Sequence, residues 1–271
     1  MIVIGGDAIV DLIDRGQRLF EACPGGSTLN CALAAGQLGS QVLYVSTLSA
    51  DSYGDLLANR LAECHVKLRA NERSSAYTSL AIVSLDETNQ PSYAFYREGT
   101  ADRDVSVADI VASFPETMSI FHVGSCALIP IEDQDAWLQV VMAAKGRGAL
   151  ISIDPNCRPS MTQDPIAYRV GVARFFHLAD LIKCSDKDLE YLHPEWSDRA
   201  LATFIRDLFT ANVRLHSRRR GASSIYKIGC FSAGFCIVTR PPVRYSGRRG
   251  LGTRDITFRD RWSGFGWAAI I

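Results

Sequence analysis

The chain has 271 residues, of which 47% are hydrophobic and 21% charged, and its formal net charge is zero. This length and composition fit a soluble globular protein with one large α/β domain or two small ones. No apolar run reaches the ~18 residues that a membrane-spanning helix needs, and residues 1–16 lack the basic segment and cleavage site of a signal peptide. We therefore expect a cytoplasmic protein with no membrane partner.

Charge is unevenly distributed along the chain. Residues 214–271 contain twelve basic and two acidic residues, a net charge of +10, and the preceding part has a net charge of −10. An asymmetry of this size is typical of a nucleic-acid-binding tail. A disrupted C-terminal part, discussed below, is the alternative explanation.

The cysteines and histidines do not form a metal-binding pattern. None of the eight cysteines has C-x-x-C spacing, and none of the five histidines forms an H-x-x-x-H pair. We expect reduced, mostly packed thiols, no zinc-hydrolase site and no metal-ligating cluster of protein side chains.

Short apolar runs alternate with helical patterns along the chain. Residues 1–4 predict a buried strand, and a helix of small residues follows at 27–38, with Ser27 or Thr28 as its N-cap. The apolar runs at 77–85 and 91–97, on either side of the polar stretch 86–90, indicate a β-hairpin. The remaining elements are predicted in chain order: strand 41–47, helix 51–64, hairpin strands 77–85 and 91–97, strand 119–123, helix 132–145, strands 149–153 and 181–183, and helix 198–210.

Repetition of strand and helix predicts an α/β fold, with a mostly parallel sheet covered by helices on both faces. The hairpin interrupts this order and is a candidate β-lid outside the main sheet. We expect a single domain over residues 1–271, with a lid built from about residues 10–20 and 75–100.

The first two candidate sites follow the first predicted strand. Ligands of open α/β sheets bind beyond the carboxyl ends of the strands, where Asp7 and Asp11 can accept hydrogen bonds from polyol hydroxyls. A turn with solvated carboxylates explains the same residues equally well. Gly25 and Gly26 precede a helix and allow close approach of a ligand, and Asn30 lies on its first turn; the alternative is a turn followed by a helix cap.

Two further candidate sites follow later strands. In the segment 154–159, Asn156 and Arg158 lie just after a strand, and Arg158 can hold an anionic phosphate; a β-turn is the alternative. Lys183, Ser185 and Asp188 follow the next strand and can serve a Mg²⁺–nucleotide through water. On the residues alone, a helix N-terminus with Ser185 as cap and Asp188 at the third position is favoured.

In this order, the four sites resemble the ribokinase-like (PfkB) carbohydrate kinases over roughly residues 1–213. Residues 93–103, Tyr-Ala-Phe-Tyr-Arg-Glu-Gly-Thr-Ala-Asp-Arg, are most like the lid of bacterial fructokinases, and residues 153–159 resemble their Asp-Pro-Asn-x-Arg-Pro turn. The resemblance implies a ribokinase-like fold and ATP-dependent phosphorylation of a sugar hydroxyl, with fructose as the first choice. It also implies ATP and Mg²⁺ as cofactors, no nucleic-acid partner, and a homodimer through the lid as one arrangement.

The resemblance assigns a role to each matching residue. Sugar hydroxyls would be contacted by Asp7, Asp11, Gly25, Gly26 and Asn30, and by Arg97 from the lid. Asn156 and Arg158 would face the transferring phosphate, with Arg158 in a catalytic role. Lys183, Ser185 and Asp188 would lie near the nucleotide and Mg²⁺.

The C-terminal part departs from the family. Its second motif, Asp-Thr-x-Gly-Ala-Gly-Asp, is missing, and the nearest text is residues 250–255, Gly-Leu-Gly-Thr-Arg-Asp. By this partial match Asp255 would be the catalytic base. The separate segment 218–226 faintly resembles the nucleotide-binding strand and turn of the family, so Gly221 would bind nucleotide. Our hypothesis is that residues 214–271 are degenerate or partly read out of frame, so that activity is impaired. The alternatives are a 2-keto-3-deoxygluconate kinase, a non-catalytic sugar-binding remnant, and a nucleic-acid-binding protein with a kinase-like body.

Overall fold

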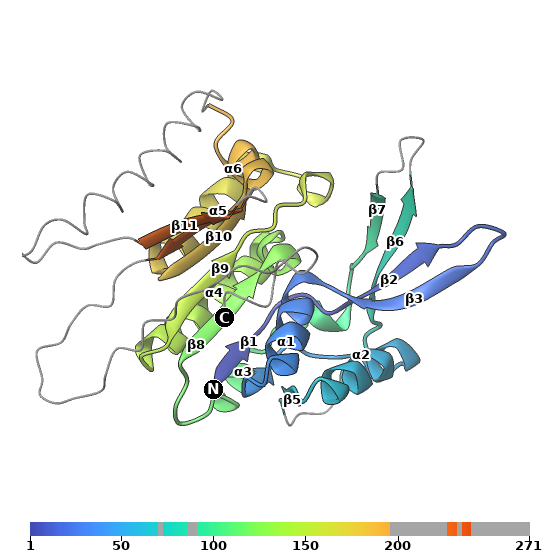
Figure 1. Cartoon of the computed structure of the whole chain (residues 1–271), viewed down its shortest axis with the longest axis horizontal. Coiled ribbons are helices and arrows are strands. Elements are labelled where there is room, and N and C mark those ends of the chain that lie inside the picture. The colour runs from blue at the N-terminus through green and yellow to red at the C-terminus, as the bar shows by residue number, and fades with distance from the viewer. Residues whose placement is uncertain (70–72, 86–90, 196–226, 232–234, 240–271) are drawn as a thin grey trace, which may run out of the picture.

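The computed structural model describes residues 1–69, 73–85, 91–195, 227–231 and 235–239. Within these ranges the chain forms a large sheet flanked by helices and a smaller sheet that extends from one end of it (Figure 1). The predicted helix at 198–210 lies outside the described residues, as do Gly221 and Asp255.

The large sheet has eight strands in the order β11-β12-β10-β9-β8-β1-β4-β5. The six strands from β10 to β5 are parallel, whereas β12 runs antiparallel to β10 and β11 antiparallel to β12. This arrangement confirms the predicted mostly parallel sheet. The strands are β1 Ile2–Ile4, β4 Val42–Tyr44, β5 Lys67–Leu68, β8 Ile120–Gly124, β9 Leu150–Asp154, β10 Leu181–Ser185, β11 Lys227–Phe231 and β12 Phe235–Thr239.

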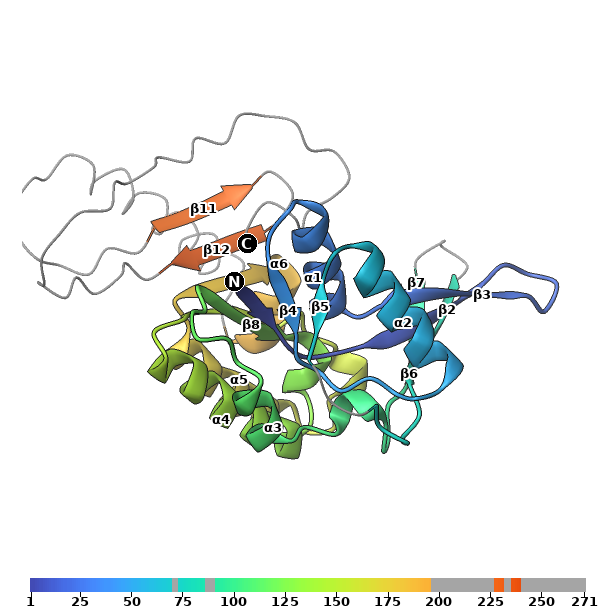
Figure 2. The same cartoon turned by 90° about the horizontal axis from the view of Figure 1, so that it is seen from below.

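Helices cover both faces of this sheet, as predicted (Figure 2). One face carries α1 and α2, and the opposite face carries α3, α4 and α5. The helices are α1 Ser27–Gln37, α2 Ser52–Glu63, α3 Val107–Ala112, α4 Ile131–Gly146, α5 Pro165–Leu178 and α6 Asp186–Leu192, with short 3-10 turns at Ala101–Arg103, Ser125–Leu128 and Pro159–Met161. None of the helices in the described part of the chain has the length and apolar composition that a membrane span requires.

Strand β1 is covered on both faces of the sheet, which explains why its sequence is continuously apolar. Val3 packs into the core beneath α3, α4 and α5, whereas Ile2 and Ile4 pack into the core beneath α1 and α2. Successive side chains of a strand point to opposite faces, so a parallel strand covered on both sides must be apolar at every position. All three residues are buried, and the strand is therefore held in the centre of the sheet.

The smaller sheet is the predicted lid. Its strands are β2 Ile9–Asp14, β3 Phe20–Gly25, β6 Ser79–Leu85 and β7 Pro91–Tyr96, in the order β3-β2-β6-β7. The sheet projects away from the large sheet at one side (Figure 1). It extends further than predicted, because β3 continues to Gly25 and so connects the lid directly to α1.

The start of α1 differs from the prediction that Ser27 or Thr28 caps it. The N-cap is Gly26, which has no side-chain group that could accept a hydrogen bond. The carboxylate of Asp7 takes this role instead, because it accepts hydrogen bonds from the backbone N–H groups of Ser27 and Thr28. A cap from another strand could not be inferred from residues adjacent to the helix.

Strands β11 and β12 were not predicted. They lie within the basic segment 214–271, and β12 pairs with β10 in register Lys183↔Ile237. At least this part of the segment therefore has backbone pairing that continues the large sheet.

Candidate active site

A cavity of about 350 Å³ lies where strands β1, β8, β9 and β10 end. The carboxyl ends of parallel strands meet at one edge of a sheet, which is where ligands of such folds bind. The predicted site residues that line this cavity are Asp7, Asp11, Gly26, Asn30, Asn156, Arg158, Lys183, Ser185 and Asp188. Gly25 and Arg97 do not line it.

Asp7 holds the start of α1 at this cavity. Its carboxylate accepts hydrogen bonds from the N–H groups of Ser27 (3.1 Å) and Thr28 (3.0 Å) and from the Thr28 hydroxyl (2.8 Å). Gly26 has φ +100°, and a Cβ there would lie 2.7 Å from the backbone oxygen of Asp7. Glycine is therefore required where the lid enters α1, both by its dihedral angle and by the close approach.

Asp11 is the half-buried carboxylate on the lid side of the cavity. Burial, aided by the negative charge of Asp7 and opposed by Arg158, raises the pKa of Asp11 to about 6. Gly25 lies against it, since a Cβ on Gly25 would collide with the Asp11 carboxylate. Gly25 therefore supports the site by making room for Asp11 and does not itself line the cavity.

The turn after β9 is held in place by three polar contacts. The N–H of Asn156 donates to Asp154 Oδ1 (3.1 Å), and Asn156 Nδ2 donates to Ser27 Oγ (2.9 Å). The N–H of Cys157 donates to Asp188 Oδ1 (2.7 Å). This turn, with Asn156 at φ 37°, thus joins α1 on one side to the start of α6 on the other.

Arg158 follows this turn and lies at the cavity. Its Nη1 donates to the backbone carbonyl groups of Asn156 and Cys157, each at 3.1 Å. These contacts use one of its two terminal nitrogens, and a guanidinium has five N–H donors in total. The group can therefore still bind an anion.

Strand β10 supplies a buried ion pair beneath the cavity. Lys183 Nζ lies 3.0 Å from Asp154 Oδ2, and the side chains are 11% and 1% exposed. Burial raises the pKa of Asp154, and the Lys183 ammonium opposes that shift. Each charge compensates the other, so removal of either partner would leave a buried charge unpaired.

The predicted capping box at the start of α6 is confirmed. The Ser185 hydroxyl accepts the N–H of Asp188 (3.1 Å), and the Asp188 carboxylate accepts the N–H of Ser185 (2.8 Å). Both residues also line the cavity. Capping and a role in ligand binding are therefore compatible at this position.

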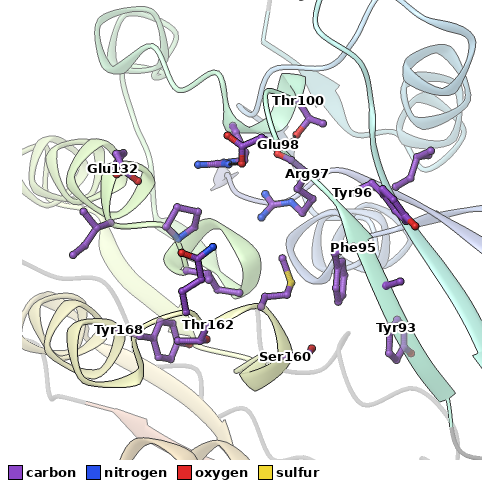
Figure 3. A pocket seen from close by; sticks show the side chains of 18 of the residues that line it. Tyr93, Phe95, Tyr96, Arg97, Glu98, Thr100, Glu132, Ser160, Thr162 and Tyr168 are labelled. Atoms are coloured by element: carbon purple, nitrogen blue, oxygen red, sulfur yellow. Dashed lines mark hydrogen bonds and ion pairs between the residues drawn. The ribbon is translucent and has the colours of Figure 1, made fainter.

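Arg97 lies behind this cavity in a buried polar cluster. Its Nη2 donates to Asp102 (2.8 Å) and its Nη1 to the backbone carbonyl of Cys126 (3.0 Å). It lines a larger neighbouring cavity of about 1520 Å³, which shares Tyr93 and Phe95 with the smaller one. Figure 3 shows these three side chains on β7 and its end, across from Thr162 and Tyr168.

Sequence reasoning missed several residues of the smaller cavity. Two signals were present: Ser125 and Cys126 follow the predicted strand 119–123, and Tyr93 and Phe95 alternate along a lid strand and so share a face. Their rings are stacked at 5.8 Å between centroids. The missed lining residues are Ile9, Ser27, Tyr93, Phe95, Ser125 and Cys126.

Comparisons with known proteins place the chain in a family. Residues 2–202 match the pfkB family of carbohydrate kinases. Fructokinase-2 of Solanum lycopersicum is 32% identical over 200 residues, which are 71% of this chain and 61% of that protein. The chain spans about three fifths of the length of the curated relatives that it matches.

Solved fructokinases have the same fold. The structure from Xylella fastidiosa with bound ATP has 31% sequence identity and a TM-score of 0.67, covering 77% of this chain and 65% of that one. The structure from Vibrio cholerae O395 with fructose, ADP and a calcium ion has 26% identity and a TM-score of 0.64, covering 76% and 67%. Together with the match over residues 2–202, these similarities show that the chain belongs to the pfkB family of carbohydrate kinases.

Proposed function

We propose that this chain transfers the terminal phosphoryl group of ATP to a hydroxyl of fructose, in the cytoplasm. The main observation behind the proposal is the cavity at the strand ends. One side of it offers the carboxylate of Asp11 and the amide of Asn30. The other side offers the Arg158 guanidinium and the capped start of α6. The similar fructokinases from Xylella fastidiosa and Vibrio cholerae, which hold ATP and fructose with ADP, support both ligands.

The lid side of the cavity is suited to a sugar. Carboxylates and amides accept and donate hydrogen bonds to several hydroxyls at once, and Asp11 and Asn30 offer such groups at the cavity wall. Tyr93 and Phe95 add two stacked aromatic rings to the lining of the same cavity. Closing the lid over a sugar bound here would exclude water, which competes with the sugar hydroxyl for the phosphoryl group.

The opposite side is suited to phosphate. Arg158 can pair with the charge of the transferring group, and Ser185 and Asp188 line the same cavity. Mg²⁺ usually binds through one or two carboxylates together with phosphates and waters, so a single acid such as Asp188 fits it. No group of three or more side chains that could hold a metal ion is found among the described residues. When bound, Mg²⁺ neutralises phosphate charge.

Two proposed residues lie outside the described ranges. We propose Asp255 as the base that takes the proton from the sugar hydroxyl and Gly221 as a nucleotide contact, on the partial motif matches alone. A second candidate function, sugar binding without catalysis, is favoured by the missing Asp-Thr-x-Gly-Ala-Gly-Asp motif.

A homodimer formed through the lid is also proposed. Leu19 and Phe20 at the tip of the β2–β3 hairpin are 62% and 52% exposed, and a second lid could cover them. Light scattering of the full chain at increasing concentration tests this arrangement. A monomer throughout would overturn it.

The proposed reaction is tested by measuring ADP formation by the full chain with ATP and Mg²⁺, with and without fructose. Fructose-dependent ADP formation that is lost in Asp255→Asn supports the kinase and its base. Fructose binding without ADP formation would identify a sugar-binding remnant, and absence of both would overturn the proposal.

A further inference from the structure

Asp102 is a buried carboxylate that connects the lid to the body of the molecule. Its Oδ2 accepts hydrogen bonds from Arg97 Nη2 (2.8 Å) and from the N–H of Ala8 (3.3 Å). Its Oδ1 accepts hydrogen bonds from the Thr100 hydroxyl (3.0 Å) and the Ser79 hydroxyl. Four donors thus converge on one carboxylate, drawn from the lid and from the loop after β1.

The pair of Arg97 and Asp102 lies directly behind the floor of the smaller cavity. Ala8 stands between Asp7 and Ile9, both of which line that cavity, and the Cys126 carbonyl that accepts from Arg97 belongs to a third lining residue. The two side chains are 5% and 1% exposed, so water screens the pair little. Any unbalanced charge here would be felt by a ligand in the cavity.

Arg97 retains one hydrogen-bond donor for which the described residues provide no acceptor. Its Nε is buried and has no partner within the described ranges, and the residue lines the larger cavity next to the sugar site. A carboxylate of a sugar acid would be the natural ligand of a guanidinium in this place. The charge of Arg97 is, however, already matched by Asp102.

The charges that line the smaller cavity disfavour an anionic sugar. Lys183 is paired with Asp154, which leaves Arg158 as the cation against the carboxylates of Asp7, Asp11 and Asp188 among the described lining residues. Arg158 is also the group proposed for the phosphate. A carboxylate on the sugar would therefore meet like charges without a free cation.

We propose that Asp102 is a specificity-determining residue, which neutralises Arg97 and so makes the site select a neutral sugar over a sugar acid of the same size. This inference rests on the proposed function, because it names the substrate class of the same cavity. Of the two sugar-kinase alternatives it favours a fructokinase, because the substrate of a 2-keto-3-deoxygluconate kinase carries a carboxylate.

Asp102→Asn tests the charge with little change of shape. Its amide oxygen can face Arg97 and Ala8, and its NH₂ can face the hydroxyls of Ser79 and Thr100, which are able to accept. The variant should therefore keep the four contacts and lose only the negative charge. A purely structural role of Asp102 predicts loss of stability without a change in ligand preference.

The experiment is isothermal titration of the full chain with D-fructose and with D-gluconate. We expect the wild type to bind fructose more tightly than gluconate. In Asp102→Asn the ratio of the two affinities should shift toward gluconate by at least about tenfold, because an unbalanced buried cation attracts the anion. In the double variant Arg97→Gln, Asp102→Asn the shift should disappear.

Asp133→Asn is the matched control. Asp133 is also a buried carboxylate and binds Arg103 at 2.9 Å, not Arg97. Loss of the Asp133 charge should leave the ratio of the fructose and gluconate affinities unchanged. An equal shift in this variant would overturn the assignment to Asp102, as would an unchanged ratio in Asp102→Asn.

A comparison on the wild type keeps the test valid if Asp102→Asn does not fold. Gluconamide has the same size as gluconate and no charge, so the wild type should bind it more tightly. Equal binding of the two would overturn the inference. If the wild type binds fructose but the predicted shifts are absent, only this inference fails; if it binds none of these ligands, the proposed function fails as well.

Discussion

Asn156 Nδ2 donates a hydrogen bond to Ser27 Oγ at 2.9 Å, across 129 positions of sequence. The contact joins the turn after β9 to the first turn of α1. In the proposed enzyme, this contact ties the phosphate side of the cavity to the sugar side. The precision of phosphoryl transfer depends on such positioning.

Removing this contact should weaken sugar binding with little effect on stability. Asn156→Gly keeps the left-handed backbone, since glycine adopts φ 37° freely, and removes only the amide. We expect Asn156→Gly and Ser27→Ala to raise the Kd for fructose by similar factors, roughly three- to tenfold. Calorimetric titration of both variants checks this; a large effect of one and none of the other would contradict a shared contact.

Asp11→Asn should stabilise the protein and weaken sugar binding. The folded-state pKa of Asp11 is raised from 3.8 to about 6, so the folded protein holds this proton more tightly than the unfolded chain. The contribution of Asp11 to stability is therefore largest below about pH 4 and is lost as the pH rises through 6. At pH 7.5 we expect Asp11→Asn to raise the Tm by a few degrees and to reduce fructose affinity.

Fructose affinity of the wild type should in turn fall as the pH drops through 6, because the protonated carboxyl of Asp11 accepts fewer hydrogen bonds. Titrations between pH 5 and 8 measure this. In Asp11→Asn the pH dependence over this range should be reduced. The same dependence in both proteins would show that another group titrates.

Lys183→Met should be strongly destabilising, because it leaves the Asp154 carboxylate buried without its cation. Breaking one side of a buried pair costs about 3–5 kcal/mol. Lys183→Met combined with Asp154→Asn should recover much of this loss. Urea denaturation of the three proteins checks it, and equal stability of the single and double variants would show that the two charges are not coupled.

Strand β1, helix α1 and the parallel sheet could be predicted because their signals are local. Residues 1–4 are continuously apolar, and a run of small residues marks the helix. Helix α5 was missed, although Asp164 accepts hydrogen bonds from the next turn and Pro165 stands at its first position. Its β-branched and aromatic residues and Gly171, which packs against Gln134, weaken the helical pattern.

The cavity could be predicted in large part because its residues follow strands whose ends must converge. The buried cluster around Arg97 and Asp102 could not be predicted, because Asp102 contacts Ala8 and Ser79 only where the lid packs onto the body. The roles of Asp7 at α1 and of Gly25 beside Asp11 likewise depend on contacts between distant segments. Sequence patterns report which residues gather at a strand end, and packing decides which of them face the ligand.

The origin of the basic segment 214–271 can be tested at the level of the gene. Translating the coding DNA from codon 210 in all three frames should reveal an Asp-Thr-x-Gly-Ala-Gly-Asp motif in another frame if the segment is partly out of frame. Such a result predicts little or no ADP formation by this chain. If no frame contains the motif, the segment is a divergent one and Asp255 becomes the acid to test.

The most direct test of the sugar site is titration of the full chain with fructose, for the wild type and for Asn30→Ala. Asn30 is exposed at the cavity wall on α1, and Gln37, exposed near the other end of the same helix, lies outside the cavity and provides Gln37→Ala as control. We predict saturable fructose binding that Asn30→Ala weakens by about tenfold and that Gln37→Ala leaves unchanged. Fructose affinity that is the same in all three proteins would contradict the placement of the sugar in this cavity.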